Sequence, residues 1–365
     1  MVIPPTCFAT KARSAAWLQP ARRRIRSASI RRSSSSTTSS GATRTRAMHS
    51  QQATRAPLTQ GEGLAFNTDG CALGAHAVKN VRLAEGASYR FRDATIYFPA
   101  HEGSNLASVV MVGGWGCGVN SMAAWGPFYA SHGIVAMTIG TPSPWRDWPK
   151  MRADALRDGV AALRAEHARP GSALHDRLDV TRFAVQGWSL GGGGAQLAVM
   201  ADPSLKCAIA LSPHSGLGLP PVLSTAVPVL FLVGQDDPSA PARKFAWEQY
   251  RQTHAPKVYL EVAGGDHAVA NGPSGGLIRE AITPCAPCAL CKSCTGMHCG
   301  CSICGTFNGA TGHARSQAPR GAIGAFALAW LQLFLQGHED ESLRTRLQIA
   351  PTISSGFECE RMQRA

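Results

Sequence analysis

A serine between glycines is the first residue of this sequence with the setting of a nucleophile. Residues 187–191, Gly-Trp-Ser-Leu-Gly, match the pattern G-x-S-x-G, in which the serine, Ser189, occupies a sharp turn between a strand and a helix. Small residues are needed beside the serine because the strand and the helix pass close to each other there. A glycine-rich loop without chemistry is the alternative. A phosphate-binding loop is excluded, because no Lys-Ser/Thr pair closes the glycine run of residues 191–194.

A serine nucleophile needs a base and a carboxylate that orients the base, and in this motif both come later in the chain, the carboxylate first. Asp236 and Asp237 follow one strand-like apolar run, and His267 comes shortly after the next. Active-site groups of open α/β sheets gather at the carboxyl ends of the strands. We therefore predict that His267 takes the proton of Ser189 and that one of the two aspartates holds the imidazole in its working tautomer.

Acyl transfer also needs two N–H donors for the oxyanion. The residue after the nucleophile, Leu190, supplies one of them, and the other comes from the loop after an early strand. The segment VVMVGGWG offers that loop, so we predict Trp115 as the second donor. The side chains of Trp115 and Trp188 flank this region and would line a substrate pocket. Packing in the core is the alternative for each, because large aromatic side chains also fill cores.

The body of the chain alternates between strand-like and helix-like segments. Short apolar runs indicate strands buried on both faces, and apolar residues at helical spacing indicate the helices between them. We expect strands at 88–100, 107–114, 134–139, 182–187, 206–212, 227–234 and 257–265, and helices at 121–133, 147–168, 190–201 and 321–337. This alternation predicts an α/β fold with a doubly wound, mostly parallel sheet and helices on both faces.

These segments resemble the PET hydrolase/cutinase-like family of the α/β-hydrolases, over about residues 85–272 and again in the last helix. The resemblance rests on VVMVGGWG, GWSLGGGG, PVLFLVGQDDPSAP and YLEVAGGDHAVAN. It implies ester hydrolysis through an acyl-enzyme, with no cofactor for catalysis. It assigns Ser189 as the nucleophile, Asp237 instead of Asp236 as the acid, and His267 as the base.

The resemblance also implies Trp115 and Leu190 as the oxyanion donors. At one position, however, this chain differs from the usual pattern of the family. The family usually has an aromatic residue, often tryptophan, after the proline at position 213, where it helps to hold an aromatic or acyl group. This chain has His214 there, which is smaller and polar. We expect His214 to contact the substrate, and the resemblance therefore implies the fold and the ester chemistry more strongly than the substrate.

Basic charge is concentrated at the N-terminus. The chain of 365 residues has a formal net charge of +13, and residues 1–61 carry eleven Lys or Arg and no acidic residue, which leaves +2 for the rest. We therefore expect no nucleic-acid partner for the body. A segment rich in Arg and Ser without acids is typical of a transit peptide, so we expect a plastid leader at residues 1–55. A mitochondrial leader and an untargeted disordered tail are the alternatives.

The expected domain organisation follows from these segments. We place the α/β-hydrolase domain at residues 62–345, with a Cys-rich insertion at 283–320 and a C-terminal tail at 346–365. No apolar run is long enough to span a bilayer, so we expect no membrane span. No feature of the sequence specifies an oligomeric state.

Seven of the twelve cysteines fall in the insertion, most of them at C-x2-C spacing. Thiolates at this spacing bind zinc or copper(I), so a structural zinc site is one hypothesis. Disulfides or a redox switch, an iron–sulfur cluster and a loop without function are the alternatives. The candidate metal ligands are Cys285, Cys288, Cys291, Cys294, Cys299, Cys301 and Cys304.

The sequence leaves three functions to weigh. The first is a serine esterase of the cutinase/polyester hydrolase type, acting on small-molecule or polymeric carboxylic esters. The second keeps the same triad and acts on a pigment, lipid or dienelactone-type ester inside a plastid. The third is a metal- or redox-sensing binding protein on a hydrolase fold that is no longer catalytic, because a fold alone does not fix a function.

Overall fold

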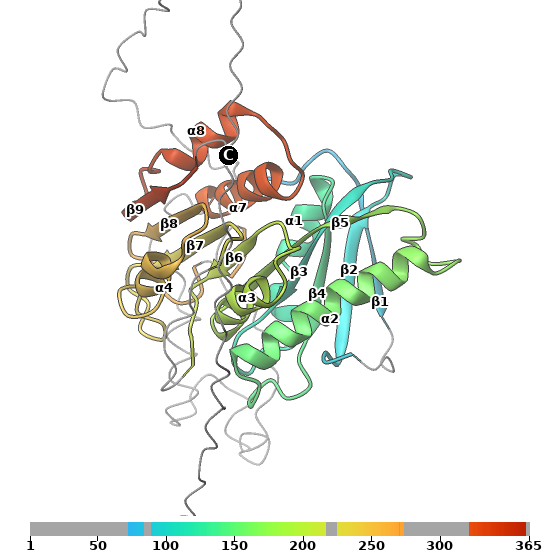
Figure 1. Ribbon diagram of the computed structural model, residues 1–365, viewed down its shortest axis with the longest axis horizontal. Helices are drawn as coiled ribbons and strands as arrows, with labels where there is room; N and C mark the ends of the chain where they lie inside the picture. Colours follow the sequence, from blue (N-terminus) through green and yellow to red (C-terminus); the bar gives the residue numbers. More distant parts are fainter. Residues whose placement is uncertain (1–71, 84–88, 217–224, 270, 274–320, 363–365) are drawn as a thin grey trace, which may run out of the picture. The chain divides into compact units, whose positions relative to one another are not determined.

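A computed structural model describes most of the chain beyond its N-terminal part. The described residues are 72–83, 89–216, 225–269, 271–273 and 321–362. Figure 1 draws the others as a thin grey trace. The chain divides into two units, Met1–Thr59 and Gln60–Ala365, and the described residues all belong to the second. The predicted leader and the predicted Cys-rich insertion lie outside them, so both stay predictions.

One mixed sheet forms the centre of the described part (Figure 1). It has nine strands in the order β1-β2-β4-β3-β5-β6-β7-β8-β9. Strands β3 to β8 run parallel, whereas β2 and β9 are antiparallel to their inner neighbours and β1 is antiparallel to β2. The strands are β1 (Val78–Leu83), β2 (Asp93–Pro99), β3 (Leu106–Val112), β4 (Val135–Gly140), β5 (Leu178–Trp188), β6 (Ala208–Leu211), β7 (Val229–Gly234), β8 (Lys257–Val262) and β9 (Ser354–Glu360). The predicted mostly parallel sheet is confirmed.

Helices follow β3, β4, β5 and β7 before the next parallel strand, as the sequence pattern predicts, and two more lie between β8 and the antiparallel β9. They are α1 (Trp125–Ser131), α2 (Pro149–Ala168), α3 (Leu190–Ala201), α4 (Ala246–Gln252), α7 (Gly321–Phe334) and α8 (Glu341–Gln348), with a 3-10 turn, η2, at Val119–Met122. Helix α2 begins with Pro149, whose missing N–H does no harm at that position, and it ends just before Pro170-Gly171. Among the described residues, no helix combines the length and the apolar character that a membrane crossing requires.

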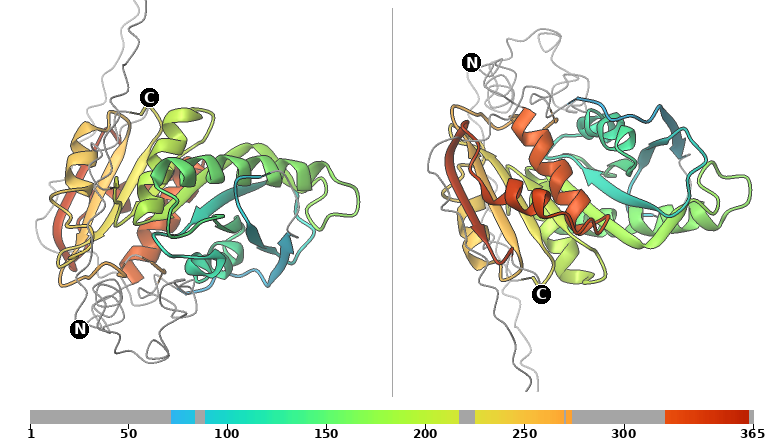
Figure 2. Two further views of the ribbon diagram at one scale, coloured as in Figure 1. Left: turned by 90° about the horizontal axis from the view of Figure 1, so that it is seen from below. Right: turned by 90° about the horizontal axis from the view of Figure 1, so that it is seen from above.

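The helices cover both faces of the sheet (Figure 2). One hydrophobic cluster joins strand residues such as Met111 to Trp125 of α1 and Trp330 of α7. The other joins strand residues such as Val110 to Leu156 of α2 and to side chains of α3 and α4. Successive side chains of a strand point to opposite faces, so each inner strand supplies both clusters, and its covered part is mainly apolar. All residues of β3, β6 and β7 are accordingly buried.

The two edge strands were not among the strands expected from the sequence. Most residues of β1 are exposed, and β9 is only half-buried, so neither carries the continuous apolar pattern of an inner strand. The expectation of a C-terminal tail at 346–365 is corrected here, because β9 lies in that segment and pairs with β8 as part of the sheet. Polar edge strands of this kind also reduce unwanted pairing with other chains.

The parallel strands end at one common edge of the sheet. Strand β3 ends at Val112, β5 at Trp188, β7 at Gly234 and β8 at Val262. The chain leaves β3 for β4 on one side and then crosses to β5 on the other, so its winding reverses between β3 and β5. Ligands of open α/β sheets bind at the carboxyl ends of the strands beside such a reversal, and Ser189 directly follows β5 at this point.

Candidate active site

Ser189 occupies a strained turn between β5 and α3. Its φ is 58° and its ψ is −121°, a conformation that residues other than glycine rarely adopt. The N–H of Ser189 donates to the carbonyl of Leu211 at 2.9 Å, and its own carbonyl accepts from the N–H groups of Gly192, Gly193 and His214. Strained backbone persists only where the surrounding structure fixes it, and it concentrates at functional sites. The structure thus contains the strand–turn–helix that the motif predicts.

Glycines let the backbone pass this turn at distances that exclude a side chain. A Cβ on Gly187 would lie 1.9 Å from the carbonyl oxygen of Gly191, and a Cβ on Gly191 would lie 2.5 Å from the carbonyl oxygen of Val112 in β3. A Cβ on Gly114 would lie 2.7 Å from the Cβ of Ser189. The loop after β3 therefore lies directly against the serine.

The rest of the glycine run brings helix α3 close to its neighbours. A Cβ on Gly193 would lie 2.5 Å from the carbonyl oxygen of His214, and a Cβ on Gly194 would lie 2.9 Å from the Cβ of Arg152 in α2. All four glycines are buried within α3. The alternative of a glycine-rich loop is therefore wrong: the run is helical and allows close packing.

His267 and Asp237 form a buried pair. Nδ1 of His267 lies 2.6 Å from Oδ2 of Asp237, and the side chains are 8% and 0% exposed. The other carboxylate oxygen accepts N–H bonds from Ser239 at 2.9 Å and Ala240 at 2.8 Å, so the carboxylate is fixed on both sides. Asp236, the other candidate from the sequence, is exposed.

Trp188 connects this pair to the serine turn. Its indole N–H donates to the carbonyl of His267 at 2.8 Å, and the rings of Trp188 and His267 lie 4.8 Å apart. Because Trp188 precedes Ser189 in the chain, this contact fixes the histidine loop beside the serine. Trp188 is only 1% exposed and belongs to the core, so the expectation that it lines a substrate pocket is not supported.

The two loops that carry the acid and the base are joined by backbone contacts. The N–H of Asp236 donates to the carbonyl of Gly265 at 2.8 Å. A Cβ on Gly234 would lie 2.3 Å from that same carbonyl oxygen, so only glycine permits the approach. Asn271, the last residue of the GGDHAVAN segment, donates from its side chain to the carbonyl of Ser121 and ties the histidine loop to η2.

The two predicted oxyanion donors flank Ser189. Leu190 is the first residue of α3, where an N–H has no acceptor within the helix. Trp115 follows Gly114, which lies against the serine, and its side chain is half-buried. Its indole N–H donates to the carbonyl of Trp145 at 2.8 Å. Leu190 adjoins the serine in the chain, and Trp115 adjoins Gly114, which follows the neighbouring parallel strand β3.

His214 also lies at this edge of the sheet. Its ring stacks on Phe245 with centroids 4.0 Å apart, and its Nδ1 accepts the backbone N–H of Gly216 at 2.9 Å. Burial, reinforced by nearby His267, lowers the pKa of His214 to about 4. The ring is therefore neutral at pH 7, with its proton on Nε2.

Three residues at the site were not singled out from the sequence. Phe245 precedes α4 and holds His214, Asn271 holds the histidine loop, and Arg152 lies buried beside the glycine run. Phe245 and Arg152 stand outside the motifs, and their contacts are not local in sequence. Asn271 ends the segment YLEVAGGDHAVAN quoted above, so its spacing from His267 was the feature that could have identified it.

None of the predicted metal ligands in the Cys-rich segment belongs to the described residues. Within the described ranges, no group of three or more His, Cys, Asp or Glu could hold a metal ion. The described cysteines, Cys117, Cys207 and Cys359, are free thiols. Burial raises the pKa of Cys117 to about 11 and raises that of Cys207 further, so both are protonated and unreactive at neutral pH.

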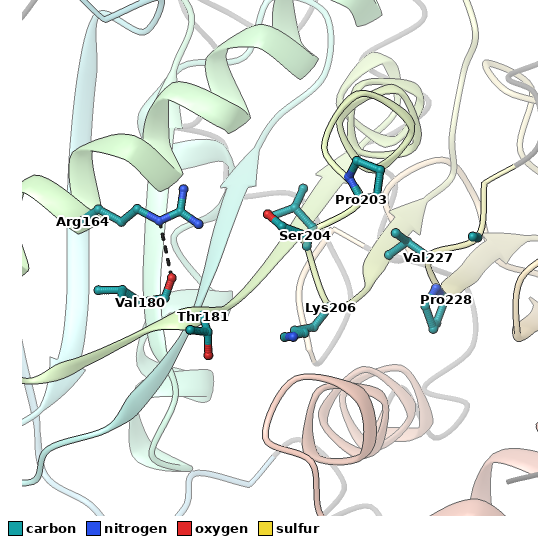
Figure 3. A pocket seen from close by; sticks show the side chains of 10 residues that line it. Arg164, Val180, Thr181, Pro203, Ser204, Lys206, Val227 and Pro228 are labelled. Carbon is teal, nitrogen blue, oxygen red and sulfur yellow. Dashed lines mark hydrogen bonds between the residues drawn. The ribbon is translucent and has the colours of Figure 1, made fainter. Parts of the chain in front are cut away.

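A groove of about 440 Å³ lies at the opposite, amino-terminal edge of the sheet (Figure 3). Arg164 and Lys206 border it, and Arg164 donates to the carbonyl of Val180 at 3.4 Å. Apart from Arg164 in α2, the residues that line the groove precede β6 and β7 or lie early in β5. It is therefore separate from the serine turn.

Comparison with known proteins gives one family and several relatives. The family model described as PETase, PET hydrolase-like, matches residues 54–283. Cutinase 1 of Thermobifida cellulosilytica is 33% identical over 205 residues, which cover 55% of this chain and 75% of the cutinase. A cutinase of Thermobifida fusca (strain YX) is 33% identical over 205 residues, 55% of this chain and 65% of that protein.

Lipase 1 of Moraxella sp. (strain TA144) is 28% identical over 196 residues, which cover 53% of this chain and 59% of the lipase. The chain thus spans less than two thirds of the length of this lipase and of the Thermobifida fusca cutinase. The family match includes the loop after β3, the serine turn and the loops that carry Asp237 and His267.

Proposed function

The chain belongs to the PET hydrolase-like family of α/β-hydrolases, and from this premise we propose that it is a serine esterase that hydrolyses carboxylic esters. One observation carries the proposal: the 2.6 Å contact of His267 with Asp237 lies beside the strained turn of Ser189. A nucleophile, a base and a group that orients the base are the parts that acyl transfer requires.

In the proposed reaction, Ser189 attacks the carbonyl carbon of the ester through its Oγ. Nε2 of His267 takes the hydroxyl proton, the bond from the acyl carbon to the alcohol oxygen breaks, and the alcohol leaves with that proton. The acyl group stays on Ser189. A water molecule then attacks the acyl carbon with His267 again as the base. The bond from the acyl carbon to Oγ of Ser189 breaks, Oγ takes the proton back from His267, and the carboxylic acid leaves.

Asp237 sets the state of the base in this proposal. Its Oδ2 faces Nδ1 of His267, so the neutral ring carries its proton on Nδ1 and presents the lone pair of Nε2 to the serine. The N–H bonds from Ser239 and Ala240 stabilise the charged carboxylate. The pair therefore also stabilises the imidazolium that forms during each proton transfer.

The negative charge that develops on the ester oxygen is assigned to two backbone donors. We propose the N–H groups of Leu190 and Trp115, because one begins α3 beside the serine and the other follows the glycine that touches it. Preorganised donors of this kind contribute about 3 kcal/mol each to the stability of the transition state.

The substrate class follows from the relatives and from His214. Relatives named cutinase and lipase support carboxylic esters of small molecules or polymers as the substrates. His214 and Phe245 form an aromatic pair beside the catalytic residues, and Nε2–H of the neutral His214 ring is a donor suited to an oxygen of the bound ester. No cofactor is required for this chemistry.

The test compares the full chain with a Ser189→Ala variant. Hydrolysis of short- and medium-chain p-nitrophenyl esters and covalent labelling by a fluorophosphonate probe are measured for both. We expect labelling of the parent alone and a loss of about 10⁴-fold or more in kcat in the variant. A folded parent that neither hydrolyses these esters nor takes the label would favour a binding protein on a non-catalytic hydrolase fold.

A further inference from the structure

Arg152 is a cation buried in the first turn of α2. Its exposed fraction is 0%, and it is one of the largest fully buried side chains among the described residues. Burial lowers its pKa to about 10, so it is still protonated at neutral pH. A buried charge without partners is strongly unfavourable. The hydrogen bonds that compensate the burial therefore identify what the side chain holds.

All three guanidinium nitrogens donate to backbone carbonyls of two loops. Nη1 donates to Gly113 at 2.9 Å, Nη2 to Pro144 at 2.9 Å and Nε to Asp147 at 3.0 Å. Gly113 belongs to the loop after β3, and the other two belong to the loop between β4 and α2. The rigid planar fork of an arginine fixes such a set of acceptors, which the single charge of a lysine does not.

The same two loops are joined on either side of Trp115. The N–H of Gly116 donates to the carbonyl of Pro144 at 2.9 Å, so this oxygen accepts from both Gly116 and Arg152. The indole of Trp115 donates to the carbonyl of Trp145, and the two rings meet edge to face at 4.9 Å. Trp115 is therefore held from the Gly113 side and from the Gly116 side.

The glycine run of α3 makes room for this arrangement. A Cβ on Gly194 would lie 2.9 Å from the Cβ of Arg152, so a larger residue there would displace the start of α2. The helix that begins at the nucleophile thus packs directly on the residue that holds the loop after β3. Arg152 therefore contacts both α3 and the loop after β3, the two segments that carry the proposed oxyanion donors.

We propose that Arg152 is a positioning residue for ester hydrolysis, which holds the N–H of Trp115 in the orientation that binds the oxyanion. It acts through the carbonyls of Gly113 and Pro144 and does not touch the substrate. This inference rests on the proposed esterase function. A shift of about 1 Å in a catalytic group costs on the order of 100-fold in rate, so the effect of a loosened loop is measurable.

The experiment compares Arg152→Lys and Arg152→Gln with a matched control, Arg177→Lys. Arg177 also donates to backbone carbonyls, those of Pro99, His101, Gly103 and Ala173, but at the amino-terminal edge of the sheet. Near-UV circular dichroism checks folding. The kcat and KM for a p-nitrophenyl ester and the amide hydrogen exchange of residues 113–117 are then measured in the full chain.

We expect both Arg152 variants to lose about 100-fold in kcat with KM within about threefold of the parent, and to exchange faster at 113–117. The control should change neither. Unchanged kcat and exchange in a folded Arg152 variant would overturn the proposal, as would a loss confined to KM. If neither Arg152 variant folds while the control does, Arg152 is a general requirement for folding and the specific role is rejected.

Hydrogen exchange separates this inference from the proposed function. If the parent hydrolyses no ester, the esterase proposal fails by itself. Faster exchange at 113–117 in the Arg152 variants would then still show that Arg152 fixes the loop, whereas unchanged exchange would reject that as well.

Discussion

The two edges of the parallel sheet carry similar polar side chains, but they hold them differently. At the carboxyl-terminal edge, the carboxylate of Asp237 is fully buried and contacts the imidazole of His267. The two residues are 30 positions apart in the chain and lie in loops that follow different strands. At the amino-terminal edge, beside the groove in Figure 3, Ser204 also donates to a carboxylate, that of Asp202, at 2.6 Å. That partner is only two residues away, and Ser204 is exposed.

The difference shows what separates a chemical site from a polar surface. Ser204 with Asp202 and Thr181 with Asp179 form local turns that a short exposed segment makes by itself. The contact of Asp237 with His267 exists only because β7 and β8 are paired in register. Burial then strengthens the electrostatic interaction, whereas water weakens it at the other edge. Four tests, two of them with a matched control substitution, examine this contrast.

The largest effect is expected for Asp237→Asn. An amide can donate to Nδ1 and hold the wrong tautomer of His267, so kcat/KM for a p-nitrophenyl ester should fall by about 10⁴-fold. The matched substitution at the other edge, Asp202→Asn, should leave kcat/KM within about twofold, because only an exposed turn changes. Similar losses in the two variants would contradict the contrast.

The next effect concerns stability. In Gly187→Ala, the new methyl group would lie 1.9 Å from the carbonyl oxygen of Gly191, so the turn must deform. We expect a loss of about 3 kcal/mol in the free energy of unfolding in urea. Gly171 has a φ of +81° but no atom within 4 Å of an added Cβ, so Gly171→Ala should cost about 1 kcal/mol. Equal losses would show that the serine turn is not tightly packed.

A smaller effect depends on pH. The folded chain binds a proton at His214 only near pH 4, whereas the unfolded chain binds it below its ordinary pKa of 6.5. The unfolded state therefore binds more protons between these values, and stability falls as the pH falls from 6.5 towards 4. Because the ring is partly exposed, we expect this loss to be about 1 kcal/mol.

The measurement for His214 is the free energy of unfolding at pH 7 and pH 4.5 in the parent and in His214→Gln. The parent should lose about 1 kcal/mol more than the variant over this interval. The same loss in both proteins would mean that His214 is solvated like an exposed histidine.

The smallest effect is expected at the groove. Lys206 is exposed, so Lys206→Ala should change the free energy of unfolding by less than about 0.5 kcal/mol and leave ester hydrolysis unchanged. Thermal unfolding and the p-nitrophenyl assay measure both. A clear loss of hydrolysis in Lys206→Ala would mean that the groove at the amino-terminal edge affects catalysis at the other edge, which would contradict the contrast.

Much of the fold could be predicted from local patterns. The inner strands are mainly apolar where both faces are covered, and this pattern identifies β3, β4, β6, β7, β8 and the second half of β5. The edge strands β1 and β9 were not predicted, because they lack this apolar pattern. Their side chains are largely exposed, so their sequences resemble loops, and only pairing with a neighbouring strand makes them part of the sheet.

One part of the candidate site could likewise be predicted from the sequence, and another part could not. Its residue types and chain order identified Ser189 and His267, since each follows a strand that ends at one edge of the sheet. The choice between Asp236 and Asp237 did not follow from their positions, because adjacent residues share the same sequence context. In the structure only Asp237 points inward to the imidazole, and Asp236 is exposed.

By itself, the sequence determined the alternation of strands and helices, the strained turn at Ser189 and the edge at which polar groups gather, because each depends on neighbours within a few residues. Only the tertiary structure decided that Trp188 supports His267 from the core and that Arg152 is a buried cation bonded to two loops. An arginine in the first turn of a helix is ordinarily exposed. Its burial depends on Gly194 in α3 and on the carbonyl of Gly113 in the loop after β3, which are distant in sequence and come close to Arg152 only when the sheet has formed.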